Sequence, residues 1–128
     1  MASSNCRILC VDDHEDTSEM LQLLLSGEEY EVFIARSFDE AIELCKRQQF
    51  DLYVLDKRLP DVSGLALCRR LNEITPGVPC IFYSGDAYEI HRQEAFAAGA
   101  DAYVAKPDID KLIEAVHSLL AGTECAPN

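Results

Sequence analysis

Basic residues are scarce in this sequence: 11 Lys and Arg stand against 23 Asp and Glu, and the net charge is −12. A chain this acidic repels nucleic acid phosphates, because binding to them depends on positive side chains. We therefore expect no direct binding to nucleic acid. Long apolar runs are also missing, since no stretch approaches the ~20 residues that span a membrane. We expect no membrane insertion.

Secretion signals and metal-binding cysteine motifs are missing as well. Residues 1–5 lack the basic and apolar segments of a signal peptide, which makes the cytoplasm the expected location. The cysteines form no Cys-x-x-Cys pair and no cluster with zinc-finger spacing. Most of them stand in apolar runs, so we expect free thiols rather than a disulfide framework. The six cysteines are Cys6, Cys10, Cys45, Cys68, Cys80 and Cys125.

The length of 128 residues fits one domain, and 48% hydrophobic residues supply enough apolar surface for a core. No linker or internal repeat divides the chain. We expect a single domain over residues 1–128, with a packed part from about residue 6 to residue 121 and a frayed tail over 122–128.

Short apolar runs alternate along the chain with amphipathic segments of helical period. The runs predict strands at residues 7–11, 30–35, 52–55, 80–83 and 102–105. The amphipathic segments predict helices at residues 15–26, 38–48, 64–72, 86–98 and 109–120. This alternation is typical of right-handed βαβ units, which build a parallel sheet with helices on both faces.

Individual residues mark the ends of the predicted helices. Ser37 opens the second helix with a capping-box pattern, and Asp108 can cap the last helix. Gly27 provides a stop for the first helix. The residues of the first helix that we expect to face the core are Met20, Leu21, Leu24 and Leu25.

Polar side chains stand where four of the predicted strands end. The carboxyl ends of parallel strands meet at one edge of the sheet, where open α/β sheets bind their ligands. We therefore expect these side chains to form one site. Asp12 and Asp13 follow the first strand, Asp56 the third, Ser84 the fourth and Lys106 the fifth.

Three carboxylates at one sheet edge repel one another unless a cation lies between them. Mg²⁺ prefers a few carboxylate oxygens plus water, and Mn²⁺ could replace it. Lys106 then supplies a point charge for a phosphoryl oxygen, and the Ser84 hydroxyl can donate to another. These residue types fit Asp56 as a nucleophile that accepts a phosphoryl group as an acyl phosphate.

Each of these residues also has a simpler interpretation. Asp12 and Asp13 could cap the following helix, Ser84 could belong to a turn, and Lys106 could be a solvated lysine. Their placement at the ends of four different strands favours the shared site over the separate explanations.

The ordered set of motifs resembles the receiver domain of two-component response regulators, from residue 7 to about residue 121. That family has an acidic pair after the first strand and a phosphoacceptor Asp, followed by Pro and Gly, after the third. It has Thr or Ser after the fourth strand and Lys-Pro after the fifth. The matching residues here are Asp12 and Asp13, Asp56 with Pro60 and Gly64, Ser84 with Gly85, and Lys106 with Pro107.

The resemblance implies a metal-ligand set around Mg²⁺. Asp13 and Asp56 would bind the ion directly, Asp12 largely through water, and Arg58 through its backbone carbonyl. The resemblance also implies a cis bond before Pro107.

The same resemblance implies a flavodoxin-like, doubly wound α/β fold with a five-stranded parallel sheet in the order 2-1-3-4-5. It implies that Ser84 and Tyr103 form the switch, and that the fourth helix, fifth strand and last helix form the output face for a protein partner. The phosphodonor would be a histidine kinase or a phosphotransfer protein, and a phosphorylation-dependent dimer is compatible with the family. His14, His91 and His117 are not convincing phosphodonors, because one neighbours the acidic pair and the others lie on predicted helical surfaces.

Arg58 and Asp86 each lie two residues beyond a site residue, Asp56 and Ser84 respectively. Both side chains should therefore rim the same cleft, where they could form an ion pair or remain two solvated charges. Exposed pairs are worth only about 0–1 kcal/mol, so we expect the pair to affect the lifetime of the phosphorylated state more than stability.

Three other classes of protein compete with a phosphorylation-switched receiver. A haloacid-dehalogenase-like phosphatase needs a second Asp two residues after the nucleophile, where this chain has Arg58. We therefore do not expect the chain to be an enzyme. A receiver-like interaction module without phosphorylation usually lacks part of the site, and nothing is missing here. A nucleotide-binding Rossmann domain needs a Gly-rich turn after the first strand. Residues 12–15 of this chain are three acidic residues and a histidine, which excludes that class.

Overall fold

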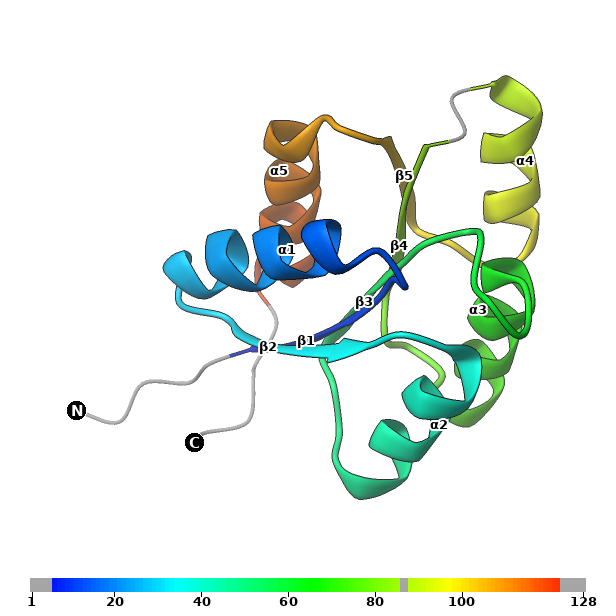
Figure 1. The fold of residues 1–128 in the computed structure, drawn as a ribbon, viewed down its shortest axis with the longest axis horizontal. Coiled ribbons are helices and arrows are strands. Elements are labelled where there is room, and N and C mark those ends of the chain that lie inside the picture. The colour runs from blue at the N-terminus through cyan, green and yellow to red at the C-terminus, as the bar shows by residue number, and fades with distance from the viewer. Residues whose placement is uncertain (1–5, 86–87, 123–128) are drawn as a thin grey trace.

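The computed structural model describes residues 6–85 and 88–122 of the chain (Figure 1). Within these ranges, five strands alternate with five helices. The strands are β1 (Arg7–Val11), β2 (Glu31–Ala35), β3 (Leu52–Leu55), β4 (Cys80–Ser84) and β5 (Ala102–Ala105). The helices are α1 (Glu15–Gly27), α2 (Phe38–Arg47), α3 (Gly64–Ile74), α4 (Glu89–Ala97) and α5 (Ile109–Leu120).

The strands form one parallel sheet in the order β2-β1-β3-β4-β5, which confirms the predicted doubly wound α/β fold. The chain runs outward from β1 to one edge, returns to β3 and then continues to the other edge. The strand order therefore reverses between β1 and β3, and this switch point is where such sheets place a ligand cleft. The ends of β1 and β3 carry Asp12 and Asp56.

Two apolar layers cover the sheet, because successive residues of a strand point to opposite faces. Leu9 and Val11 of β1 belong to the layer beneath α2, α3 and α4. Ile8 and Cys10 of the same strand belong to the layer beneath α1 and α5. Figure 1 shows the two groups of helices on opposite sides of the sheet. The central strand β3 is buried over its whole length, as its continuous apolar run predicts.

The predicted caps of α2 and α5 are confirmed. The Ser37 hydroxyl accepts a hydrogen bond from the backbone N–H of Glu40, 3.1 Å away. A carboxylate oxygen of Asp108 accepts from the backbone N–H of Lys111 at 3.2 Å. These side chains satisfy backbone donors that have no partner inside the helix.

Two predictions about α1 are wrong. The helix includes Gly27 as its last residue and is capped by Glu28, and the positive φ angle that follows, 68°, belongs to Glu29. Leu24 is 36% exposed, whereas Leu21 and Leu25 are buried and Met20 packs beside them. The inward stripe of α1 is therefore narrower than the run of leucines suggests.

Other boundaries differ slightly from the prediction. Helix α3 continues to Ile74, strand β4 includes Ser84, and β2 begins at Glu31. Helix α4 begins at Glu89, and the predicted helix start at Asp86 or Ala87 lies outside the described residues. Most of the predicted tail, residues 123–128, also lies outside them.

One cysteine corrects the prediction of free thiols, because Cys6 is disulfide-bonded. A single disulfide can form without the set of paired cysteines that is typical of secreted domains, so the composition does not reveal this disulfide. Cys125 lies outside the described residues. The free thiols are Cys10, Cys45, Cys68 and Cys80.

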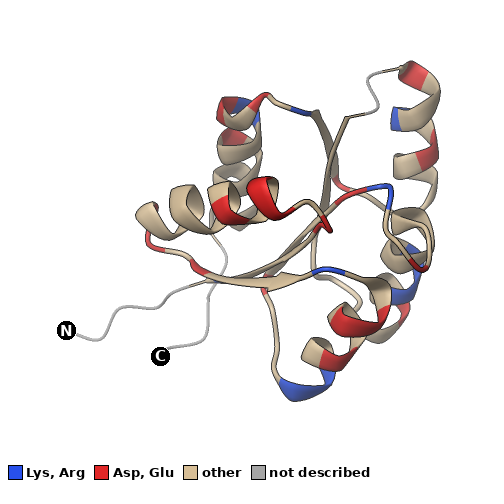
Figure 2. Ribbon diagram, viewed as in Figure 1, with Lys and Arg blue, Asp and Glu red and all other residues tan. Residues whose placement is uncertain are grey.

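Charge is spread over the surface of the fold. Figure 2 shows acidic segments on α1, α2, α4 and α5, with smaller basic segments among them. Among the helices that the structure describes, none is long and apolar enough to cross a membrane.

Candidate functional site

Backbone hydrogen bonds place the predicted site residues at the carboxyl edge of the sheet. The N–H of Asp56 donates to the carbonyl of Val11 at 2.9 Å, and the N–H of Asp12 donates to Ala35 at 3.0 Å. Both residues thus continue the hydrogen bonding with the neighbouring strand for one residue beyond the end of their own strand. Lys106 is fixed in the same way, by a 2.8 Å bond from its N–H to the carbonyl of Ser84.

Gly64 holds the loop after β3 close to Asp56. Its N–H donates to the carbonyl of Lys57 at 2.8 Å. A Cβ atom at this position would lie 2.0 Å from the carbonyl oxygen of Asp56, far inside van der Waals contact. Glycine is therefore required by space rather than by an unusual φ angle. This contact explains why Gly64 follows the carboxylate at short range.

Lys106 joins the two buried carboxylates of the site. Its Nζ donates to Oδ2 of Asp12 at 2.8 Å and to Oδ2 of Asp56 at 3.2 Å. Both aspartates are only 3% exposed. Burial alone would lower the pKa of Lys106, but hydrogen bonds and charge attraction from Asp12 and Asp56 raise the pKa overall. The ammonium group therefore stays positive and offsets the repulsion between the acids.

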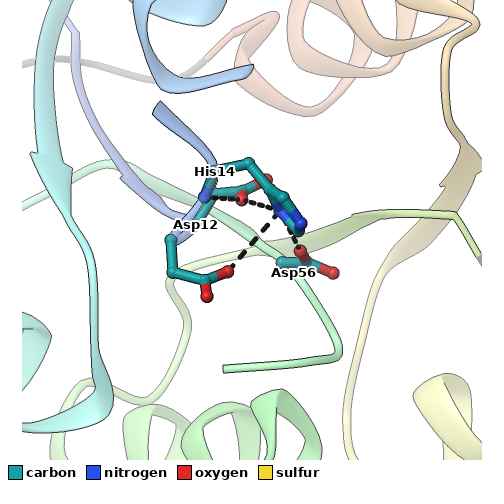
Figure 3. A group of neighbouring side chains, drawn as sticks. Asp12, His14 and Asp56 are labelled. Atoms are coloured by element: carbon teal, nitrogen blue, oxygen red, sulfur yellow. Dashed lines mark hydrogen bonds and ion pairs between the residues drawn. The ribbon is translucent and has the colours of Figure 1, made fainter. Parts of the chain in front are cut away.

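His14 faces the same carboxylates. Its Nδ1 lies 2.8 Å from Oδ1 of Asp12, and 3.5 Å from both Oδ1 of Asp13 and Oδ2 of Asp56. Figure 3 shows the ring pointing toward Asp12 and Asp56. The hydrogen bond to Asp12 raises the pKa of His14 above its ordinary value. The sequence predicts only that His14 is not a phosphodonor, and its place in the site was not predicted.

A cavity of about 280 Å³ opens over these groups and is lined by five of the predicted site residues. Asp13 lies beside it, in the group of potential metal ligands whose donor atoms are all within 4.8 Å of one another. Asp86, the predicted partner of Arg58, lies outside the described residues. The cavity is lined by His14, Thr17, Asp56, Arg58, Ser84, Gly85 and Lys106. Thr17 was not predicted, although it lies only one helical turn beyond His14.

Tyr103, the predicted switch aromatic, is 6% exposed and packs against Phe82 with ring centroids 6.4 Å apart. Arg92 of α4 lies over the Tyr103 ring and donates to its backbone carbonyl at 3.2 Å.

The bond between Lys106 and Pro107 is cis, as predicted.

Lys57 connects the loop after β3 to α4. Its Nζ donates to Oε1 of Glu94 at 2.6 Å and also contacts Nδ1 of His91. The hydrogen bond from Lys57 lowers the pKa of Glu94. This contact could not be predicted, because residues 57 and 94 are far apart in the sequence and neither belongs to a motif.

A family model describing the response regulator receiver domain matches residues 8–117. The chain therefore belongs to the family of response regulator receiver domains, the regulatory modules of two-component systems.

Full-length response regulators are among its relatives. The chain is 31% identical over 115 residues to the cell cycle transcriptional regulator CtrA of Caulobacter vibrioides, covering 89% of this chain and 50% of CtrA. It is 34% identical to the regulatory protein VanR of Enterococcus faecium, covering 79% of this chain and 43% of VanR. The chain thus spans about half the length of the curated relatives it matches.

Solved structures agree with this assignment. A putative response regulator from Chloroflexus aurantiacus superposes with a TM-score of 0.87 at 32% identity, covering 91% of this chain and 98% of that one. The response regulator TrrA from Thermotoga maritima, in complex with Mg(2+)-BeF, superposes with a TM-score of 0.81 at 33% identity. That match covers 90% of this chain and 99% of TrrA.

Proposed function

We propose that Asp56 accepts a phosphoryl group from the phosphohistidine of a sensor kinase or phosphotransfer protein, and that the phosphorylated chain signals through protein partners. One observation carries this proposal. The buried Asp56 carboxylate lines an open cavity together with the Ser84 hydroxyl region and the Lys106 ammonium group. A nucleophile, a hydroxyl donor and a fixed cation thus face one space large enough for a phosphoryl group.

The transfer exchanges one bond to phosphorus for another. A carboxylate oxygen of Asp56 attacks phosphorus and forms a P–O bond, while the P–N bond of the donor breaks and its electron pair returns to the imidazole. Lys106, now 3.2 Å from the Asp56 carboxylate, is placed to neutralise a phosphoryl oxygen. Ser84 lies on the same cavity wall and can donate to another oxygen.

Mg²⁺ fits the donor set at this site. The carboxylates of Asp12, Asp13 and Asp56 offer oxygen ligands within 4.8 Å of one another. Of these, Asp13 and Asp56 would bind directly, with the backbone carbonyl of Arg58, and Asp12 through water; Mn²⁺ could substitute. When bound, the ion would neutralise charge on the phosphoryl oxygens. The complex of TrrA with Mg(2+)-BeF supports this part of the proposal.

The residue two positions after Asp56 supports a signalling role over an enzymatic one. A phosphatase of the dehalogenase type needs an acid–base carboxylate there, and this chain has Arg58. Without such a carboxylate, the chain would assist only its own phosphorylation and dephosphorylation. A module that acts without phosphorylation is disfavoured, because every group needed for phosphotransfer lines or borders the cavity.

The proposed output face consists of α4, β5 and α5. Ser84 ends β4 at the cavity, and Tyr103 lies on the neighbouring strand β5, beneath Arg92 of α4. Movement of Ser84 toward a phosphoryl group would therefore reach α4 through Tyr103. The partner is a protein or a second copy of the chain, and the location is the cytoplasm. With a net charge of −12, contact with nucleic acid would need another domain.

The proposal is tested by incubating the chain with Mg²⁺ and acetyl phosphate and measuring its intact mass. The wild type should gain the mass of one phosphoryl group, and Asp56→Asn should gain none. Asp110→Asn is the matched control, because Asp110 is an exposed aspartate on α5 and its replacement should leave the mass gain intact. A wild type that gains no mass contradicts the proposal.

A further inference from the structure

We propose that Cys68 and Cys80 form a redox modification site, at which hydrogen peroxide joins the two thiols in a reversible disulfide. Cys68 lies on α3 and Cys80 begins β4, and both belong to the apolar layer beneath α2, α3 and α4. Asp56 follows the far end of the neighbouring strand β3. The pair is therefore a separate site from the phosphoacceptor, and no step of the proposed function depends on it.

The two thiols already contact each other in the folded chain. Their side chains are hydrogen-bonded, and both residues are 0% exposed. The backbone of Cys80 is held in place by Asp101, whose carboxylate accepts from the Cys80 N–H at 2.9 Å. A disulfide requires two cysteines on neighbouring elements whose side chains face each other. Cys68 and Cys80 satisfy that requirement.

The contact makes one thiol a nucleophile and the other a proton donor. The hydrogen bond from Cys80 lowers the pKa of Cys68, against the opposing effect of burial. The same hydrogen bond, together with burial, raises the pKa of Cys80, so this thiol keeps its proton. Because the thiolate is the form that attacks an oxidant, Cys68 should react first. Burial raises the pKa of both Cys10 and Cys45, which makes these thiols less reactive.

A cavity of about 260 Å³ lies beside the pair and is lined in part by Asn72, Gly99 and Asp101. The Nδ2 atom of Asn72 lies 3.9 Å from Sγ of Cys68 and donates to the carbonyl of Ala98 at 3.3 Å. Gly99 leaves room for this amide, because a Cβ atom there would lie 1.9 Å from Nδ2. Asn72 thus touches both the cavity and Cys68, and rotation of its side chain would let a molecule as small as hydrogen peroxide reach the sulfur.

The oxidation takes two steps. The Cys68 thiolate attacks one oxygen of hydrogen peroxide, an S–O bond forms, and the O–O bond breaks. The departing hydroxide takes up the proton that Cys68 released on ionising and leaves as water. The sulfur of Cys80 then attacks the sulfur of Cys68, the S–S bond forms, and the hydroxide displaced from Cys68 leaves as water with the Cys80 proton. Two electrons pass from the thiols to the peroxide, and a thiol reductant reverses the bond by exchange.

The test is peptide mapping of the folded chain after treatment with hydrogen peroxide. The treated chain is denatured, alkylated without reductant and digested with trypsin, which cleaves after Arg69 and Arg70 and so separates the two cysteines. We expect the peptides of Cys68 and Cys80 to be joined and to carry no alkyl group. Cys10 and Cys45 should be alkylated in the same sample. Dithiothreitol, added before alkylation, should make Cys68 and Cys80 alkylatable again.

Three variants probe the roles of the individual residues. In Cys80→Ser, oxidation should stop at the sulfenic acid of Cys68, which dimedone captures. Asn72→Ala should oxidise faster than wild type, because it uncovers Cys68. Cys10→Ser is the matched control: Cys10 is a buried thiol of the opposite layer, and its loss should leave the new disulfide unchanged.

Alkylation of both Cys68 and Cys80 after peroxide treatment would overturn the inference. A bond from Cys80 to Cys45 instead would overturn it as well, because the nucleophile would then be the wrong thiol. Oxidation of Cys10 at the same rate as Cys68 would also contradict it, since equal rates indicate that the unfolded chain reacts rather than a built site.

Discussion

Lys57, the residue directly after Asp56, places its Nζ 2.6 Å from Oε1 of Glu94 on α4. This ion pair connects the loop of the candidate site to a helix that buries few of its side chains. Ile90 and Phe96 of α4 are 58% and 43% exposed, and among the described residues of this helix only Ala95 is buried. The position of α4 therefore depends in part on a charge contact next to Asp56.

Glu94→Gln should loosen α4 with little effect on global stability. A pair with one exposed partner adds little to global stability, whereas its loss acts locally on a helix that buries little surface. Hydrogen exchange of the α4 amides should become faster in the variant. Glu43→Gln, which breaks an exposed pair with Lys46 on α2, is the control and should leave α4 unchanged. Unaltered exchange in Glu94→Gln would show that the contact does not hold the helix.

The same ion pair predicts an acid dependence. The pKa of Glu94 is lower in the folded chain than its ordinary value of 4.5, so the contact stabilises α4 fully above that pH. The stabilisation is lost as the pH falls below 4.5 through the folded-state pKa. Exchange of the α4 amides, corrected for intrinsic rates, should accelerate over this acid range in the wild type and not in Glu94→Gln.

Two buried tyrosines should respond in opposite ways to loss of their hydroxyl groups. Within the described residues, the hydroxyl of Tyr83 has no hydrogen-bond partner, whereas that of Tyr53 bonds to Thr75 at 2.9 Å. An unpaired buried polar group costs about 1–3 kcal/mol, and a paired one contributes about 1 kcal/mol. Urea unfolding should show Tyr83→Phe more stable than wild type and Tyr53→Phe less stable by about 1 kcal/mol. A loss of stability in both variants would contradict the assignment for Tyr83.

Lys106→Met should make stability depend more strongly on metal. The variant leaves the buried carboxylates of Asp12 and Asp56 without their cation, and such a loss costs about 3–5 kcal/mol in a closed interior. The open cavity admits water, so we expect a loss of about 2 kcal/mol in metal-free buffer. Added Mg²⁺ should restore more stability in the variant than it adds to the wild type. If Mg²⁺ stabilised both proteins equally, Lys106 and the ion would not be neutralising the same carboxylates, and the prediction would be wrong.

Gly64→Ala should damage the site through the backbone of Asp56. The new Cβ would lie 2.0 Å from the Asp56 carbonyl oxygen, and overpacking of this kind costs about 1–3 kcal/mol. Phosphoryl labelling should slow as the carboxylate moves. Gly27→Ala is the control: no atom lies within 4 Å of its added Cβ, and alanine should stabilise the end of α1 by about 0.5–1 kcal/mol. Normal labelling of Gly64→Ala would mean that the loop can move without Asp56.

The sheet and the meeting of Asp12, Asp56 and Lys106 could be predicted from the sequence. Each of these residues follows a short apolar run, and parallel strands bring such positions to one edge whatever the details of the loops. The cap at Ser37 was predictable for a similar reason, because it depends only on neighbouring residues.

The contacts of His14 and Lys57 could not be predicted in this way. The direction of the His14 ring depends on a turn closed by the Asp12 carboxylate, and Lys57 reaches a helix whose position no local pattern specifies. The prediction for the end of α1 was wrong for another reason: Glu29 takes the left-handed conformation although Gly27 lies nearby. In each case the sequence leaves several local conformations open.

The most direct test of the central claim is the location of the phosphoryl group. The chain is labelled with acetyl phosphate and Mg²⁺, reduced with borohydride to convert an aspartyl phosphate to homoserine, and analysed by peptide mass spectrometry. We predict homoserine at position 56 and at no other aspartate. Modification of Asp12 or Asp13 instead, or no homoserine in a chain that has gained phosphoryl mass, would contradict the assignment of Asp56 as phosphoacceptor.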